Sequence, residues 1–311
     1  MSTSAAPLPI KALRDAFGSD LQENVMLGNY TTARVGGAAD ALLIVHSADE
    51  LADTVQKLWD IEAPYRVLGG GSNVLISDKG LREVVVVNRA NQIKVNAESD
   101  PPTVWAESGA ANVQIGKRLA LRGLSGFAWA TYIPGTIGGA VYGNAGAHGG
   151  DIARKLILAD ILHPEYGRVQ WTAEDFDYGY RSSIIKCSDC KAVVLTVCLA
   201  LKHSTPEKVE ARLQKILERR KSVQPPGSSL GSIFMNPQDD KAGRLIEAAG
   251  LKGTRIGDVE ISQKHANFFI NHGDAHAKDI YALIRLAQKS VEEKFGVALK
   301  MEIELLGEWT E

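Results

Sequence analysis

The sequence lacks several features that would assign the chain to common classes of protein. Its three cysteines, Cys187, Cys190 and Cys198, are an odd number and form no disulfide framework, which is typical of a reducing cytoplasm. The net charge is −2 at pH 7, so no basic field recommends nucleic acid or an anionic membrane as a partner. Residues 1–9 show no basic start followed by an apolar run, so no secretory signal is indicated. Cys187 and Cys190 have the spacing of a zinc or redox pair, but no second ligand pair follows, and we expect no metal.

Charge is also missing from one long stretch, because no Asp, Glu, Lys or Arg occurs between Arg122 and Asp151. A membrane-spanning helix would need about 20 continuous apolar residues. Pro134 and seven glycines in residues 135–150 argue against one, because they break helices and leave backbone groups that lipid cannot satisfy. Two interpretations remain at this point: a glycine-rich wall against a large cofactor, or a set of tight turns in a β-rich core.

A second glycine cluster, GGGSN at residues 69–73, lies between two predicted strands, residues 64–68 and 74–76. It is not the dinucleotide fingerprint, because Val74 occupies the place of the third glycine and no helical pattern follows. Such a turn can still bind a pyrophosphate through its backbone N–H groups and through the Ser72 and Asn73 side chains. The two clusters together favour the cofactor interpretation.

The rest of the 311 residues, 45% of them hydrophobic, alternates strand and helix patterns and is long enough for two or three domains. Ser47 begins a capping box, Asn112 is expected to cap a helix that ends at Gly123, and Pro206 starts an amphipathic helix with one charged face. Helices are predicted at residues 11–17, 48–59, 112–122, 205–217, 242–249 and 279–295, and strands at 41–45, 65–68, 83–87, 103–108, 155–162, 168–171, 192–201 and 297–306.

Six motifs in order resemble one family closely. They are LGGGSNVL at residues 68–75, IPGTIGGA at 133–140, YRSS at 180–183, GSIFMNP at 231–237, AGRLI at 242–246 and KHANF at 264–268. The resemblance is to the UDP-N-acetylenolpyruvoylglucosamine reductases, flavoenzymes of bacterial peptidoglycan synthesis, and it covers residues 29–307. The chain has no room for the tyrosine loop and split fold of the longer class, so it is similar to the shorter class.

The resemblance implies an α+β fold. A lead-in helix, residues 1–28, would precede an FAD-binding region of the vanillyl-alcohol-oxidase (PCMH) type with two subdomains, residues 29–203. An α/β substrate-binding domain, residues 204–311, would follow. It further implies a cytoplasmic enzyme, expected to be a monomer, that uses NADPH and non-covalent FAD to reduce UDP-N-acetylglucosamine enolpyruvate to UDP-N-acetylmuramate.

Three residues match the family's catalytic positions. Arg181 would hold the substrate carboxylate with its rigid fork, and Ser232 would give a proton to C2 after hydride reaches C3. Glu302, placed in the last predicted strand, would lie on the opposite side of that carboxylate and be protonated or share a proton.

The resemblance also implies contacts to the two nucleotides. Those expected to bind FAD are Gly69, Gly70, Gly71, Ser72, Asn73, Pro134, Gly135, Thr136, Gly138, Gly139, Asn144 and Gly146, and a bulky side chain at Gly138 is expected to enter the space of the cofactor. Those expected to bind substrate are Tyr180, Asn236, Lys252 and His265. The chain departs from the family's pattern at Met235, where many members have Lys, and at Met301, where Pro is common.

Two other functions stay open on these residues. A related FAD oxidase would attach its flavin covalently, and His148 is the histidine beside the glycine-rich stretch. A flavin or nucleotide-sugar binding protein without catalysis is kept open by Met235 and Met301, but it is opposed by the joint presence of Arg181, Ser232 and Glu302.

Overall fold

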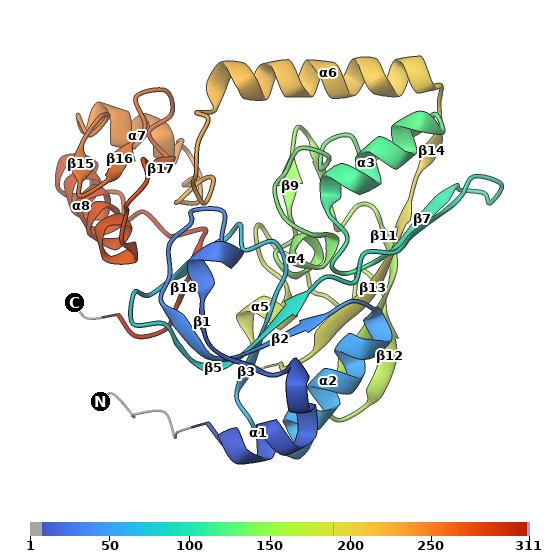
Figure 1. The fold of residues 1–311 in the computed structure, drawn as a ribbon. Coiled ribbons are helices and arrows are strands. Elements are labelled where there is room, and N and C mark those ends of the chain that lie inside the picture. Colours follow the sequence, from blue (N-terminus) through green and yellow to red (C-terminus); the bar gives the residue numbers. More distant parts are fainter. Residues whose placement is uncertain (1–7, 189, 310–311) are drawn as a thin grey trace.

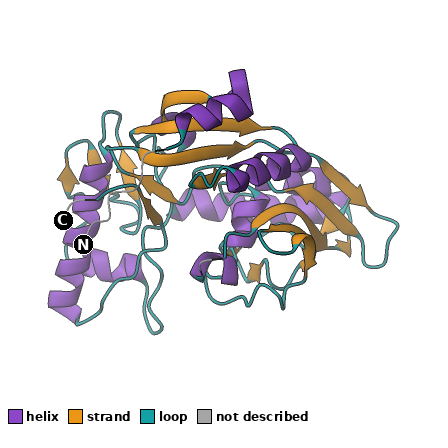
Figure 2. Cartoon of the chain, turned by 90° about the horizontal axis from the view of Figure 1, so that it is seen from below, coloured by secondary structure: helices purple, strands orange, loops and turns teal. Residues whose placement is uncertain are grey.

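The computed structural model describes residues 8–188 and 190–309, and it shows helices and strands mixed along the whole chain (Figures 1 and 2). The α-helices are α1 (Ile10–Phe17), α2 (Ala48–Asp60), α3 (Asn112–Leu121), α4 (Ile137–Tyr142), α5 (Ile184–Cys187), α6 (Pro206–Val223), α7 (Ala242–Ala248) and α8 (Ala277–Phe295). None of these helices combines the length and apolar character needed to cross a bilayer.

The first sheet has the order β1-β2-β5-β3. Its strands are β1 (Gln22–Met26), β2 (Ala38–Val45), β5 (Leu81–Asn88) and β3 (Tyr65–Leu68), and β2 and β3 both pair with β5 in parallel. The parallel pairing follows from the crossover through α2, which begins at the Ser47 cap as expected: the Ser47 side chain accepts from the Glu50 N–H. The apolar face of α2 packs on this sheet.

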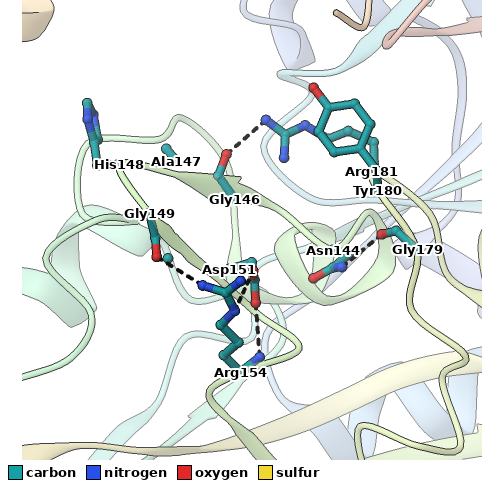
Figure 3. Close-up of a pocket in the computed structure, with 11 residues that line it drawn as sticks. Asn144, Gly146, Ala147, His148, Gly149, Asp151, Arg154, Gly179, Tyr180 and Arg181 are labelled. Atoms are coloured by element: carbon teal, nitrogen blue, oxygen red, sulfur yellow. Dashed lines mark hydrogen bonds and ion pairs between the residues drawn. The ribbon is translucent and has the colours of Figure 1, made fainter. Parts of the chain in front are cut away.

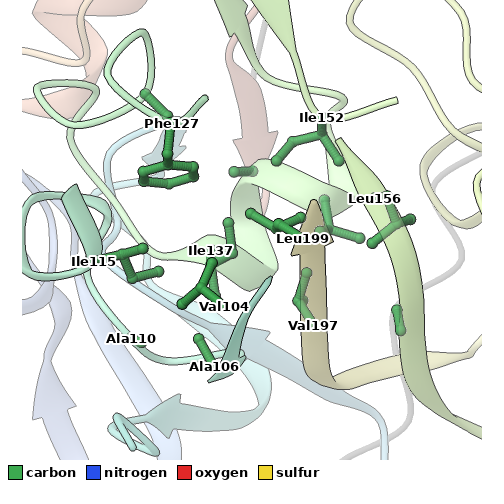
Figure 4. Close-up of a cluster of buried hydrophobic side chains, with 14 of the residues drawn as sticks. Val104, Ala106, Ala110, Ile115, Phe127, Ile137, Ile152, Leu156, Val197 and Leu199 are labelled. Carbon is green, nitrogen blue, oxygen red and sulfur yellow. The ribbon is translucent and has the colours of Figure 1, made fainter. Parts of the chain in front are cut away.

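The second sheet is antiparallel, with the order β12-β11-β13-β7-β6. It consists of β12 (Gly167–Trp171), β11 (Leu156–His163), β13 (Val193–Ala200), β7 (Thr103–Glu107) and β6 (Ile93–Asn96), and the expected hairpin of β11 and β12 is present. Helices α3 and α4 pack on one face of this sheet and bury a large apolar cluster with it, including Ile115, Phe127 and Ile137 (Figure 4).

The cap expected at Asn112 is wrong. The residue before α3 is Ala111, Asn112 is its first helical residue, and its side-chain amide donates to the Ile133 carbonyl at 3.3 Å. The amide is engaged by a tertiary contact, because its partner lies in the glycine-rich stretch. The local sequence pattern around Asn112 cannot reveal such a remote partner. That stretch is also more ordered than a run of turns, because it contains α4, capped by the Thr136 side chain.

The last third has its own core. The sheet β15-β16-β17 (Arg255–Ile256, Val259–Ile261 and Phe269–Asn271) packs with α7 and α8. α8 ends at Gly296 in the left-handed conformation, as predicted. The long final strand predicted over residues 297–306 is wrong: only β18 (Glu304–Leu306) forms, and it pairs in parallel with β4 (Val74–Ile76), directly after the first glycine cluster.

Three short pairs complete the fold. They are β8 with β14 (Leu124–Ser125 and Lys202–His203) and the hairpin of β9 and β10 (Gly146–Ala147 and Gly150–Asp151), besides β4 with β18. The pair β4–β18 brings the end of the chain against the first glycine cluster, and the β9–β10 hairpin follows α4 directly. Together they place the candidate site between the early and the late parts of the sequence.

Candidate active site

The two glycine clusters lie against each other, although about 60 residues separate them in the sequence. A Cβ atom added to Gly70 would come within 2.8 Å of the Gly135 Cα, so the two backbones approach more closely than any larger residue permits. The Ser72 hydroxyl donates to the Pro134 carbonyl at 3.1 Å and joins the two segments. Gly135 itself has φ +110°, which favours glycine.

The first cluster forms a cradle of backbone donors. Among the described residues, the five N–H groups of residues 69–73 have no hydrogen-bond acceptor. Successive free N–H groups in a glycine-rich turn are suited to an anion such as a pyrophosphate. The cradle therefore fits the diphosphate of FAD, and it does so through the backbone.

The side chains of Ser72 and Asn73, which were expected to bind the pyrophosphate, have hydrogen-bond partners within the protein. Ser72 bonds to Pro134, and the Asn73 amide donates to the Glu302 carbonyl at 3.1 Å. Both side chains therefore fix the position of the cradle, because each bonds it to another segment of the chain.

The glycines of α4 have different roles. The Gly138 N–H donates to the Ser108 carbonyl at 2.8 Å, and a Cβ at Gly138 would lie 2.7 Å from the Ser108 Cβ. The expectation that a side chain at Gly138 enters cofactor space is therefore wrong: it would collide with the end of β7. A Cβ at Gly139 meets only the Thr136 hydroxyl, at 3.7 Å, so Gly139 faces open space.

Asn144 and Gly146 hold the turn that carries Arg181. The Asn144 amide donates to the Gly179 carbonyl at 2.9 Å, and the Gly146 carbonyl accepts from Arg181 Nη2 at 2.8 Å. Arg181 has φ +58°, a conformation that is uncommon for residues other than glycine and is often found at functional sites. The close-up in Figure 3 shows these contacts around one hollow.

Arg181 and Glu302 form an ion pair across 121 positions of sequence. Arg181 Nε donates to Glu302 Oε1 at 2.6 Å, and both side chains are largely buried, 23% and 19% exposed. Glu302 precedes β18 instead of lying in a strand. Its carboxylate accepts a hydrogen bond from the guanidinium of Arg181 itself.

Ser232 lies next to the same acid through the backbone. The Glu302 N–H donates to the Ile233 carbonyl at 2.8 Å, and Phe234 pairs with Met301. Asn267 holds this loop from the other side, since its side chain bonds both the N–H and the carbonyl of Phe234. Ser232 as a whole residue is half-buried.

The sequence reasoning missed a second charged group beside this pair. Glu304 accepts from the Tyr142 hydroxyl at 3.2 Å and pairs with Lys186 at 3.6 Å. Burial, and then the neighbouring Glu304, raise the pKa of the Tyr142 phenol well above its usual range. This network joins α4, α5 and β18, and so braces the segment that carries Arg181. Its only sequence signal is the two-residue spacing of Glu302 and Glu304, which puts both on one side of an extended chain.

The residues expected to bind substrate separate into two places. Tyr180 is exposed and stacks on Arg181, whose guanidinium carbon lies 5.2 Å from the ring centre. Asn236 accepts from the first N–H of α7 at 3.2 Å. Lys252 pairs with Glu247 at 2.8 Å, and burial, with help from Lys252, lowers the pKa of the His265 imidazole. Asn236, Lys252 and His265 thus lie around α7.

A hollow of about 410 Å³ lies at the Arg181 turn, a size typical of small-molecule sites. It is lined by Asn144, Gly146, Ala147, His148, Gly149, Gly150, Asp151, Arg154, Gly179, Tyr180 and Arg181. Its charged side chains already have partners, since Arg154 pairs with Asp151 at 3.3 Å and Arg181 with Glu302. No cluster of possible metal ligands occurs among the described residues.

Comparisons with known proteins agree with this arrangement. Residues 39–165 match the model of an FAD binding domain, and residues 223–306 match the C-terminal domain of UDP-N-acetylenolpyruvoylglucosamine reductase. The reductase of Chloroflexus aggregans is 39% identical over 297 residues, 94% of this chain and 100% of the relative. That of Synechococcus sp. strain RCC307 is 42% identical over 93% of this chain and 94% of the relative.

A crystal structure agrees as well. The UDP-N-acetylenolpyruvylglucosamine reductase of Thermus caldophilus superposes with a TM-score of 0.78 at 35% identity, covering 91% of this chain and 98% of that one. The expected α+β architecture and the expected FAD cofactor are thereby confirmed. The chain belongs to the UDP-N-acetylenolpyruvoylglucosamine reductase family of FAD-dependent oxidoreductases.

Proposed function

We propose that the chain reduces UDP-N-acetylglucosamine enolpyruvate to UDP-N-acetylmuramate with electrons from NADPH, and that Arg181, Ser232 and Glu302 are its catalytic residues. FAD, held at the glycine cradle of residues 69–73, would supply the hydride transfer between NADPH and C3 of the enolpyruvyl group. The observation that carries the assignment is the Arg181–Glu302 pair at 2.6 Å, held beside the Ser232 loop on one side and the glycine cradle on the other.

Arg181 is suited to the substrate carboxylate. Hydride arriving at C3 places negative charge on C2 and on the carboxylate, so a fixed cation stabilises the transition state more than the ground state. The guanidinium is held by Glu302, by the Gly146 carbonyl and against Tyr180. It is therefore oriented before substrate binds, and Asn144 bonds the neighbouring Gly179 in support.

Ser232 completes the reduction by giving its proton to C2. A hydroxyl is a weak acid, so the charge developing on C2 and a nearby acidic group must assist the transfer. The Glu302 N–H is bonded to the Ile233 carbonyl, next to Ser232, and Glu302 is the acidic group that assists the transfer.

The two departures from the family have different surroundings. Met301 pairs with Phe234 and packs on the apolar core of the last third, so an apolar side chain suits this position. Met235 is half-buried, and its N–H donates to the Lys300 carbonyl at 2.9 Å. The cation that many relatives carry there is missing, and another basic group must serve the phosphates.

Ser232→Ala tests the assignment. Flavin reduction by NADPH should stay normal, and reoxidation by the enolpyruvyl nucleotide should slow by about 10²–10⁴-fold, the usual worth of one positioned acid. Ser228→Ala, in the same loop and outside the proposed site, is the matched control and should behave as wild type in both half-reactions. A Ser232→Ala enzyme that is reoxidised within about tenfold of wild type would exclude Ser232 as the donor.

We also propose non-covalent FAD, a monomer that works in the cytoplasm, and no nucleic-acid or membrane partner. The three cysteines are free thiols, which suits a reducing compartment. The net charge of −2 supports the absence of a polyanionic partner. We propose the same domain limits as before, at residues 28 and 203.

A further inference from the structure

A short segment early in the chain, residues 31–35 just before β2, packs in the last third of the molecule. Ala33 and Val35 are 1% and 4% exposed, and both lie in the apolar cluster built on α7 and α8. The Asn271 side chain donates to the Ala33 carbonyl at 2.9 Å. Within the segment, the Thr31 hydroxyl donates to the Val35 carbonyl at 2.9 Å and closes a turn. The segment is therefore anchored in the last third, although it leads into the first sheet.

Thr32, inside this segment, bonds two parts of the candidate site. Its N–H donates to the carbonyl of Gly71 in the glycine cradle at 3.0 Å. Its hydroxyl donates at 2.7 Å to the carbonyl of Ser229, three residues before Ser232. The hydroxyl also lies 3.5 Å from the Gly71 carbonyl, but it has a single proton to donate, and the Ser229 carbonyl is much closer. One residue thus connects the cradle to the loop that carries Ser232.

The cradle has no freedom to shift against this segment. Gly71 has φ +59°, and a Cβ atom there would collide with the Tyr30 carbonyl. The two backbones are therefore in direct contact, which glycine alone permits. The position of Thr32 is thus set by the cradle.

The Ser232 loop is held at both ends by backbone hydrogen bonds of 2.9 Å, at residue 228 to Asn271 and at residue 233 to Asn267. Between these ends, the Leu230 side chain is buried in the apolar cluster. In the part of the chain that the structure describes, the bond from Thr32 is the one hydrogen bond that reaches residues 229–232 from another segment. Thr32 is therefore the polar anchor of the loop.

The place of Ser232 depends on this backbone. Gly231, the residue before it, has φ +74°, and a Cβ atom there would meet no atom within 4 Å, so packing does not hold this position. The Ser232 hydroxyl has no hydrogen-bond partner among residues 8–188 and 190–309. It is free to face a substrate, but the protein orients it only through the loop.

Other contacts join the early and late parts of the chain without Thr32. Besides the β4–β18 pair, Asp78 accepts from the N–H groups of Ala277 and Lys278, at the start of α8, at 2.8 and 2.9 Å. None of these contacts involves residues 229–232. Loss of the Thr32 hydroxyl should therefore loosen the Ser232 loop and leave the fold intact.

We propose that Thr32 is a positioning residue for the reduction and holds Ser232 at a fixed place relative to the glycine cradle. Hydride must reach C3 and a proton must reach the adjacent C2, and the groups that supply them are held by different parts of the chain. A misplacement of about 1 Å can slow a reaction roughly 100-fold. The inference rests on the proposed function, because it takes Ser232 as the proton donor.

The test is stopped-flow absorbance of the flavin-loaded Thr32→Val protein, which keeps the N–H and the side-chain shape and loses the hydroxyl. Flavin content and flavin reduction by NADPH should equal those of wild type. The limiting rate of reoxidation by the enolpyruvyl nucleotide should fall about 10- to 100-fold, and the nucleotide concentration that gives half of this rate should change little. Thr32→Ser restores the hydroxyl and should recover the wild-type rate.

Thr196→Val is the matched control. It removes a hydroxyl that donates to Asp160 at 2.6 Å in the second sheet, away from the site, and should leave both half-reactions as in wild type. If Thr32→Val does not fold, Thr32→Ala takes its place, because it removes the hydroxyl without a methyl group against the Ser229 carbonyl. Reoxidation of the Thr32 variant at the rate of Thr196→Val would overturn the proposal.

A double variant shows whether Thr32 acts through Ser232. Residues that act through one another are not additive, so Thr32→Val should slow the Ser232→Ala enzyme no further. Multiplication of the two effects would overturn the proposal, even where each single variant is slow. Failure of the proposed function is read separately, from Ser232→Ala alone: rapid reoxidation of that variant would remove Ser232 as the donor, and with it the role of Thr32.

Discussion

Gly139→Ala separates the two roles that glycine has in the wall of the site. Gly139 is inside α4, and a Cβ there meets only the Thr136 hydroxyl, at 3.7 Å. Alanine in a helix interior is more stable than glycine by about 0.5–1 kcal/mol. The ligand-free protein should therefore gain that free energy of unfolding, and its melting temperature should rise by roughly 1–3 °C for a chain of this size.

FAD binding should change in the opposite direction. If the flavin nucleotide lies against this wall, the new methyl group enters its space, and overpacking of this kind costs about 1–3 kcal/mol. The dissociation constant of FAD should then rise roughly 5- to 150-fold. FAD content is measured as absorbance of the supernatant after acid precipitation, and flavin that stays in the pellet would instead reveal covalent attachment, with His148 as the residue to examine.

Gly138→Ala is the matched comparison. Its Cβ would lie 2.7 Å from the Ser108 Cβ and 2.8 Å from the Ser108 carbonyl oxygen, so the ligand-free protein itself should lose stability. A Gly139→Ala protein that binds FAD within twofold of wild type would refute the placement of the cofactor against α4. A Gly139→Ala protein less stable than wild type without ligand would refute the packing argument.

Two further predictions concern the residues that act on or hold the substrate. Arg181→Lys keeps the positive charge but loses the two-pronged guanidinium fork. Stopped-flow absorbance should show normal flavin reduction by NADPH, whereas reoxidation by the enolpyruvyl nucleotide should slow by at least about tenfold. Equal slowing of both half-reactions would mean that Arg181 supports the flavin or the fold. Asn267→Ala removes both hydrogen bonds to the backbone of Phe234 in a buried place. Chemical denaturation should show that the free energy of unfolding falls by about 2–4 kcal/mol, because an N–H and a carbonyl are left without partners. A loss below about 1 kcal/mol would mean that other groups hold the Ser232 loop.

Much of the local structure could be predicted because its causes are local. The Ser47 cap, Pro206 at the start of α6 and Gly296 at the end of α8 act within a few residues of themselves. The apolar face of α6 follows from helical periodicity alone. The cap at Asn112 and the long strand at residues 297–306 were wrong because their hydrogen-bond partners are remote: the Ile133 carbonyl in the first case, and β4, which pairs with three residues only, in the second.

The sequence by itself determined the two glycine clusters, the residue types at the site and the resemblance to the reductase family, because these depend on residue identity and order. Only the tertiary structure decided which glycine of α4 faces the protein and which faces open space, since Gly138 and Gly139 are adjacent and differ only in what lies beyond each Cα. It also decided that Arg181 and Glu302 are paired and that Glu304 braces α4 and α5. Each of these depends on long-range packing, where chain segments far apart in sequence meet, and no local pattern records that.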